Sequence, residues 1–415
     1  MTNTTILSTR KQKFISVYDE LQKNNDIMID QTGYNLISAA TAENIIYLDY
    51  VSNNPEIFCT ECGQLCSRNK GYRYVYPLMA KYNDMPIISR FKKKIMFCED
   101  CNKCTVQSTT GVPKKNQISN SIKNCIINGL KPLNANYTSV ANNNFVSVQT
   151  VINSVNSLTI PEQSLDVKII SVDEVRFIKS AGNYQFVIIN AETGEIIDML
   201  ENREAVTVNK YYSTLNTEGI TVIQDLWQTY KTAAKNHLNE ARIVADMFHV
   251  VRQASWAFNR TRVAHIKKNG NKTKLRWRSL TMSISKFDSI SKCKIKRKLK
   301  LDEIMQKVHQ AKEMFFRACR TNQKEEFNRI YEAFKRYVEK HKLSEFNAVI
   351  TSVTNWKEEI ENAIETGLSN GLAERRNSDI KQIKRNARGF KNFERSKKIM
   401  MHKINNNTQS KIYYN

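Results

Sequence analysis

Acidic residues at the ends of predicted strands are the first sign of chemistry in this sequence. Asp173 follows an apolar run that begins at Ile169, and Asp225 follows the run 222–224. Carboxylates at the ends of neighbouring strands can converge at one sheet edge, where a divalent cation relieves their repulsion. Hard oxygen ligands favour Mg²⁺ or Mn²⁺ over zinc. Glu374 is well placed to supply the third carboxylate of a two-ion site if its helix lies across that edge. Taken singly, such an Asp is more often a cap or turn residue.

The cysteines indicate a second, different metal site. Six of the nine fall into two tight groups, and in a chain without a secretory signal this clustering favours metal ligation over disulfides. Two Cys-x-x-Cys pairs have the spacing of a zinc ribbon, whose standard occupant is one tetrahedral Zn²⁺ ion. Buried free thiols are the plain alternative, and Cys66 or Cys104 can substitute for one ligand. The predicted ligands are Cys59, Cys62, Cys98 and Cys101.

The charge balance predicts a polyanionic partner. Lys and Arg outnumber Asp and Glu by 64 to 40, which gives a net charge of +24, more than solubility requires. Nucleic acid is the first candidate and an acidic membrane surface the second. No stretch approaches the roughly 20 apolar residues of a membrane span, and the first residues lack the apolar core of a signal peptide. We therefore expect a cytoplasmic protein.

One segment concentrates this positive charge. Residues 261–300 contain fourteen Lys or Arg and the single acid Asp288, together with Trp277 and Phe287. A solvated face usually mixes both signs, so contact with the DNA backbone is the favoured interpretation over simple solvation. Further cations follow Glu374 along its helix and are expected to face phosphates. The predicted DNA-contacting cations are Lys294, Lys296, Arg297, Lys381, Lys384 and Arg385.

A helix-turn-helix is predicted ahead of the acids. Residues 118–158 have a helical pattern, in which Ser147 caps a second helix and Val151 points inward. The exposed face of that helix then offers Gln149 and Asn153 to a DNA groove. Plain packing of a helical hairpin is the alternative, because any short hairpin has similar spacing.

The region around the first two acids predicts an RNase H-like fold. Three short strands that form an antiparallel meander are followed by helix, strand, helix and strand. Beyond Asp246 the pattern is helical to about residue 386. The predicted elements are strands 167–173, 184–190 and 195–200, helix 204–212, strand 220–224, helix 226–238 and strand 241–245.

On several stretches the sequence resembles the bacterial insertion-sequence transposases of the ISL-three type, which carry a DDE catalytic triad. Two departures stand out: Arg375 lies where the family commonly has Gly, and Cys104 is an extra cysteine. The resemblance extends over nearly the whole chain from Cys59 to His402. The stretches are Ser171 to Glu174, Asp198 to Arg203, Asp225 with Tyr230, Ala245 to Val250, and Ser369 to Asn377 with the residues that follow to Phe393.

The resemblance implies a transposition reaction. Asp173, Asp225 and Glu374 would hold two metal ions about 3.5 to 4 Å apart, with Asp173 bridging both. Metal-activated water would cleave double-stranded DNA at the ends of a mobile element, and the freed 3′ hydroxyl would attack target DNA. The protein would act as a homo-oligomer in a synaptic complex. Asp246 and His249, one helical turn apart, are interpreted as site-adjacent: they form a structural pair, or His249 contacts DNA.

These observations predict an α+β multidomain protein in which an all-helical insertion interrupts the catalytic core. A non-catalytic DNA-binding regulator, an inactivated transposase and a structure-specific nuclease or resolvase are the alternatives; the last would not need two sequence-reading modules. The predicted parts are an N-terminal segment 1–57, a zinc-ribbon-like module 58–112, a helix-turn-helix 113–160, the first part of the core 161–260, the insertion 261–355, and the C-terminal part of the core 356–405 with Glu374.

Overall fold

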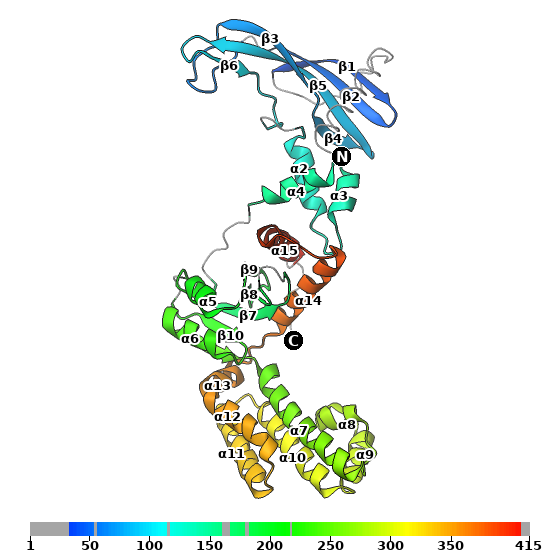
Figure 1. Cartoon of the computed structure of the whole chain (residues 1–415), viewed down its shortest axis with the longest axis vertical. Helices are drawn as coiled ribbons and strands as arrows, with labels where there is room; N and C mark the ends of the chain where they lie inside the picture. The colour runs from blue at the N-terminus through cyan, green and yellow to red at the C-terminus, as the bar shows by residue number, and fades with distance from the viewer. Residues whose placement is uncertain are drawn as a thin grey trace. The chain divides into compact units, whose positions relative to one another are not determined.

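Two units with separate sheets make up the chain, residues 1–160 and 161–415 (Figure 1). They are described one at a time. The computed structural model describes residues 33–53, 56–113, 117–159, 167–178, 182–215 and 218–407.

A six-stranded sheet forms most of the first unit. Its central strand is the long β5, which pairs with β2 in parallel and with β3, β4 and β6 in antiparallel fashion; β1 pairs with β2. The strands are β1 Tyr34–Ala42, β2 Ile45–Ser52, β3 Arg68–Val75, β4 Leu78–Tyr82, β5 Met85–Cys98 and β6 Lys103–Val106.

This sheet joins two parts that the sequence analysis separated. We expected 1–57 and 58–112 to be distinct, but β2 lies against β5, and Tyr50 stacks on Phe91 with ring centroids 4.8 Å apart. Leu48 is buried in the same core. The cysteine-containing region therefore has an apolar core that it shares with β1 and β2.

Three short helices complete the first unit, α2 Asn120–Gly129, α3 Tyr137–Asn143 and α4 Val148–Asn156. As predicted, Ser147 caps α4 by accepting a hydrogen bond from the backbone N–H of Thr150 (3.1 Å), and Val151 is fully buried. Gln149 and Asn153 are exposed and hydrogen-bond to each other (2.9 Å). The expected helical pair is present, and its role in reading DNA stays a prediction.

A five-stranded mixed sheet is the centre of the second unit. Its order is β11-β10-β7-β8-β9. The strands β7, β8 and β9 form an antiparallel meander, whereas β10 and β11 run parallel to β7. The strands are β7 Ile169–Val175, β8 Gln185–Asn190, β9 Ile196–Leu200, β10 Thr221–Gln224 and β11 Arg242–Ala245.

Helices cover both faces of this sheet (Figure 1). On one face α5 Ala205–Tyr212 and α6 Gln228–His237 bury Tyr212 and Tyr230 against Val172 and Val222. On the other, α13 Lys357–Thr366, α14 Gly371–Asn386 and α15 Phe393–Asn407 contact β11, β7 and β9 respectively. Residues of β8 are buried along almost its whole length, as a strand covered on both faces requires.

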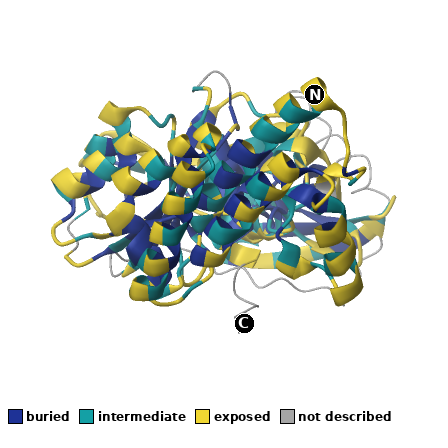
Figure 2. Ribbon diagram, turned by 90° about the horizontal axis from the view of Figure 1, so that it is seen from below, coloured by how far each residue is buried: buried dark blue, intermediate teal, exposed yellow. Residues whose placement is uncertain are grey.

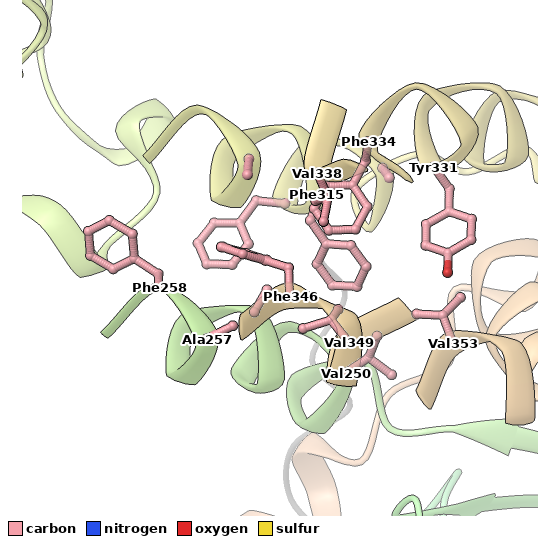
Figure 3. Packing of buried hydrophobic residues seen from close by; sticks show 14 of the residues in the cluster. Val250, Ala257, Phe258, Phe315, Tyr331, Phe334, Val338, Phe346, Val349 and Val353 are labelled. Carbon is pink, nitrogen blue, oxygen red and sulfur yellow. The ribbon is translucent and has the colours of Figure 1, made fainter. Parts of the chain in front are cut away.

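A helical region separates β11 from α13. It contains α7 Met247–Asn269, α8 Trp277–Thr281, α9 Ser289–Leu299, α10 Glu303–Ala318, α11 Lys324–Lys340 and α12 Asn347–Asn355. Aromatic rings fill its core, where Phe315 and Phe334 lie 5.2 Å apart between centroids (Figure 3). Exposed residues lie on the outward faces of the helices, and buried residues lie on the faces where helices meet (Figure 2). The apolar core of this region continues into the sheet and its covering helices through Ala245 of β11 and Ile360 and Ile364 of α13.

Candidate functional site

The register of the parallel strands brings three carboxylates to one level. The first residues of β7, β10 and β11 are paired with one another, Thr221 of β10 facing the first residue of each neighbour. Four residues further along, the three chains reach Asp173, Asp225 and Asp246. The backbone N–H of Asp246 donates to the carbonyl of Gln224 (2.8 Å), which extends the pairing to this level. The three acids therefore stand side by side at one sheet edge.

Asp173 differs from expectation in its place on the strand. We predicted that it ends the strand, but β7 continues to Val175 because its antiparallel pairing with β8 extends past Asp173. The parallel pairing with β10 stops two residues earlier, at Ser171. Asp173 thus lies where β7 has lost one neighbour, and its side chain has room beside Asp225.

Asp225, Asp246 and His249 form a compact group. One ligand atom from each lies within 4.8 Å of the others, the arrangement a divalent cation requires. His249 Nδ1 lies 2.5 Å from Asp225 Oδ1 and 3.7 Å from Asp246 Oδ2. Asp246 caps α7 by accepting from the backbone N–H of Phe248 (3.0 Å), so His249, in the first turn of α7, comes back over the acids.

The electrostatics of these three acids and His249 favour a bound cation. Burial, opposed in part by the backbone N–H of Glu174 and reinforced by the charge of Asp225, raises the pKa of Asp173 to about 7. Burial also raises the pKa of Asp246, although the Phe248 N–H and His249 oppose it. Burial lowers the pKa of His249, but the hydrogen bond and charge of Asp225 outweigh it, so this pKa is raised overall. Crowded, buried carboxylates of this kind are stabilised by a metal ion.

Glu374 lies near the acids, at the start of α14. Its side chain is exposed in the first turn of the helix, and its charge contributes to the raised pKa of Asp246. It is not a member of the compact group that Asp225, Asp246 and His249 form. Glu374 therefore lies near Asp246 but outside the compact group.

Two asparagines fix α14 against β7 on either side of Glu374. Asn377 Nδ2 donates to Asp173 Oδ2 (2.7 Å) and to the carbonyl of Glu174 (3.1 Å). The buried Asn370 hydrogen-bonds to Ser171 and donates to the carbonyl of Val172 (3.5 Å). Neither residue was predicted from the sequence, although each lies within about one turn of Glu374 in the stretch Ser369 to Asn377.

We expect Asn377→Ala to weaken cation binding about 10- to 100-fold, the usual cost of losing a partner that orients a metal ligand. The reason is that Asp173 loses the donor that orients its carboxylate. Mn²⁺ affinity would be measured by electron paramagnetic resonance. Ser378→Ala is the matched control, because the Ser378 hydroxyl donates only to the carbonyl of Glu374 among the contacts described. Unchanged Mn²⁺ affinity in Asn377→Ala would contradict this role.

Polar and aromatic side chains form a cluster around Glu174, the residue that follows Asp173. Glu174, next to Asp173, accepts a hydrogen bond from Tyr230 Oη (2.6 Å) and pairs with Arg203 (2.8 Å). The Arg203 guanidinium lies between the rings of Tyr184 (4.5 Å) and Trp227 (4.6 Å). These contacts tie the segment after Asp225 to β7, and they give a structural reason for the resemblance at Arg203 and Tyr230.

The four cysteines predicted as zinc ligands lie together in the first unit. One sulfur atom from each of Cys59, Cys62, Cys98 and Cys101 lies within 4.8 Å of the others, and the Cys62 and Cys98 sulfurs are 3.6 Å apart. Bonds of about 2.3 Å to tetrahedral zinc place sulfurs roughly 4 Å apart, so the group fits. Neither Cys66 nor Cys104 belongs to it.

Two turns position these sulfurs. In the first, Gly63 (φ +77) donates to the carbonyl of Cys59 (3.0 Å). The backbone N–H groups of Cys62 and Glu61 lower the pKa of Cys59 to about 6, which favours the thiolate that binds metal. The second turn joins β5 to β6 with Asn102 in the left-handed region (φ 52).

The predicted DNA-contacting cations lie in both α9 and α14. Lys294, Lys296 and Arg297 are exposed on α9, which contains no acid. Lys381 and Arg385 are exposed on α14, whereas Lys384 donates to the carbonyl of Arg176 (3.3 Å) and is partly committed to the fold.

A comparison with protein families finds a match that lies within the second unit. A family model described as a transposase, DDE_Tnp_ISL3, matches residues 170–400, more than half of the chain. A comparison with curated proteins found no match. In the part of the chain that the structure describes, no helix is both long and apolar enough to span a membrane.

Proposed function

The chain belongs to the ISL3-type DDE transposase family, and from this we propose that it binds the terminal inverted repeats of an insertion sequence and catalyses metal-dependent strand cleavage and strand transfer. The observation that carries the proposal is the level placement of Asp173, Asp225 and Asp246 at the edge of three parallel strands. The proposal is tested by a cleavage assay on DNA that carries the ends of the element. The sequence of these ends is taken from the inverted repeats that flank the gene.

The topology supports an RNase H-like core. An antiparallel meander of three strands, followed by two strands parallel to the first and placed on its other side, is the arrangement expected of that fold. The core would comprise 161–260 and 356–405, with 261–355 inserted between them to hold the DNA end. Asp173 and Asp225 would come from its first part and Glu374 from its second.

The proposed roles follow from these positions. Asp173 would contribute to both cation positions, and Asp225 and Glu374 to one each. When bound, two Mg²⁺ or Mn²⁺ ions supply Lewis-acid stabilisation and an activated water for phosphodiester cleavage. Asn377 orients Asp173, and His249 presents Nδ1 to Asp225, which leaves Nε2 directed away from that carboxylate. Asp246 is a further candidate ligand, which the sequence analysis placed only beside the site.

Double-stranded DNA as partner is supported by the charges of the first unit. Arg73 on β3 lies opposite Lys93 on β5, and like charges in this position destabilise a sheet. Burial and the charge of Arg73 lower the pKa of Lys93 to about 8. A phosphate beside this pair would relieve the repulsion between its two cations. Gln149 and Asn153 on α4 would add sequence reading, and a homo-oligomer would bring two DNA ends together.

Neutralising Lys294, Lys296 and Arg297 together should reduce the salt dependence of DNA binding by roughly one unit of slope per lost phosphate contact, with little change in sequence preference. The reason is that all three are exposed on α9 with no carboxylate on their own helix. Binding would be followed by fluorescence anisotropy over a range of salt concentrations.

The matched control neutralises three cations that already pair with carboxylates, Lys324 with Glu361, Arg329 with Glu326 and Lys335 with Glu332. This control should leave the slope unchanged. An unchanged slope with altered sequence preference in the α9 variant would mean that these cations read bases.

A DNA-binding regulator without catalysis is the second candidate. The separate first unit, with its own core, cysteine group and α2–α4 helices, favours it. The two functions differ in the cleavage assay, because a regulator binds the element ends and leaves them intact.

A further inference from the structure

One face of α7 carries large aromatic side chains that the described residues of the second unit leave about half exposed. Phe248 is 55% exposed and Trp256 is 51% exposed. With Arg252, they occupy positions i, i+4 and i+8 of the helix and so share one face. The opposite face is buried in the helical core through Ala254 and Phe258. Folding therefore accounts for one face of α7 and leaves the aromatic face unexplained.

Arg252 lies between the two rings. Its Cζ atom is 5.6 Å from the centroid of Phe248 and 4.7 Å from that of Trp256. Its Nε is buried and has no hydrogen-bond partner among the described residues. The guanidinium thus lies over aromatic rings, and among the described residues it forms no ion pair with a carboxylate. We call Phe248, Arg252 and Trp256 the α7 stripe.

The stripe begins at the acids and leads to the basic segment. At its start, the backbone N–H of Phe248 donates to Asp246 (3.0 Å). Phe248 and Trp256 are eight residues apart, about 12 Å along the helix. Beyond them, Asn259 accepts hydrogen bonds from Trp277 Nε1 (3.3 Å) and Arg262 (2.8 Å), and Trp277 is itself 58% exposed.

We propose that the α7 stripe binds unpaired bases of the DNA strand that is opened beside the cleavage site; this rests on the proposed function. Bases would stack on Phe248 and Trp256, with Arg252 adding cation–π attraction to the stack. The faces of bases are accessible only where a strand is unpaired. A duplex would present phosphates, which cannot stack on the two rings. A second copy of the chain would bring another net charge of +24, which disfavours contact between copies.

The test uses the full chain with Asp225→Asn as background and Ca²⁺ as the only divalent cation, so that no cleavage is needed. The probes are a fluorescent thymidine homopolymer and a random-sequence duplex. Trp256→Ala should weaken binding of the single strand about 5- to 100-fold, the usual effect of removing one stacking aromatic. Duplex affinity should stay within about twofold, and Trp256→Phe should restore most of the single-strand affinity.

Ile290→Ala is the matched control, since Ile290 is an apolar side chain 82% exposed on α9, away from the stripe. It should change neither affinity. A second readout is 2-aminopurine placed in the single strand, whose fluorescence stacking quenches; Trp256→Ala should relieve the quenching.

Equal weakening of single strand and duplex in Trp256→Ala would overturn the proposal in favour of a backbone-binding surface. A change of oligomeric state without a change in DNA affinity would overturn it in favour of contact between copies. Because none of these measurements requires cleavage, failure of the stripe and failure of the proposed catalytic function give separate results.

Discussion

Replacing Asp225 or Glu374 by its amide should reduce DNA strand cleavage by about a thousandfold or more. Each amide keeps the size of the side chain and removes the negative charge that holds a cation, and loss of metal stabilisation is worth several kcal/mol in the transition state. Asp225 should show the larger loss of Mn²⁺ affinity, because it belongs to the compact group with Asp246 and His249. Cleavage would be measured in single turnover beside a gel shift.

Binding of DNA ends should survive both substitutions, which separates catalysis from folding. Glu339→Gln, an exposed carboxylate on α11, is the matched control and should behave as the unaltered protein. Full cleavage by Glu374→Gln would remove Glu374 from the site. Loss of both cleavage and binding would show only that the fold was damaged, so the melting temperature of each variant must be measured.

Removing zinc should unfold the cysteine end of the first sheet. Cys98→Ser deletes a fully buried ligand at the end of β5, and zinc bound to four thiolates contributes on the order of 10 kcal/mol to the folding of small modules. We expect zinc content to fall from about one ion per chain to well below that, and hydrogen exchange to rise in β3, β5 and β6.

The shared apolar core limits this effect. Phe91, seven residues before Cys98 on β5, and its β2 partner Tyr50 should stay protected, because the core of β1, β2 and β5 contains no cysteine. Cys104→Ser is the control, since Cys104 lies outside the group of four. Unchanged zinc content in Cys98→Ser would contradict the ligand assignment.

Local features of the fold followed from the sequence. Apolar runs ended by turn residues predicted β8, β9, β10 and β11 within one or two residues, since strand patterning and turn chemistry are encoded nearby. The cap at Ser147 was equally local. The order of strands was inferred from their sequence order, and the four cysteines from their spacing.

Features that depend on distant pairing were not predictable in the same way. Nothing local in β2 indicates that it runs parallel to β5 and joins the cysteine region to the N-terminal strands. The place of Asp246 beside the other acids depends on the register of β11 against β10. The same signal as at Asp225, an acid directly after an apolar strand, was present at Asp246. Only the pairing shows that the two are level.

Contacts between α14 and β7 were the furthest out of reach. Asn377 and Asp173 are 204 positions apart, and the helical period indicates which residues share a face of α14 without indicating what that face meets. The asparagines therefore looked like ordinary polar residues of a helix. In the structure they hold the helix so that Glu374 lies near the acids.

Strand cleavage by the unaltered chain, on duplex DNA that ends in the terminal repeat of its element, tests the proposed function most directly. We expect cleavage at the element end with Mg²⁺ or Mn²⁺ and none with a chelator of divalent ions or with Ca²⁺ alone, because Asp173, Asp225 and Glu374 would act through bound cations. Stable, specific binding of the same DNA with no cleavage under any divalent cation, or cleavage that persists without one, would contradict it.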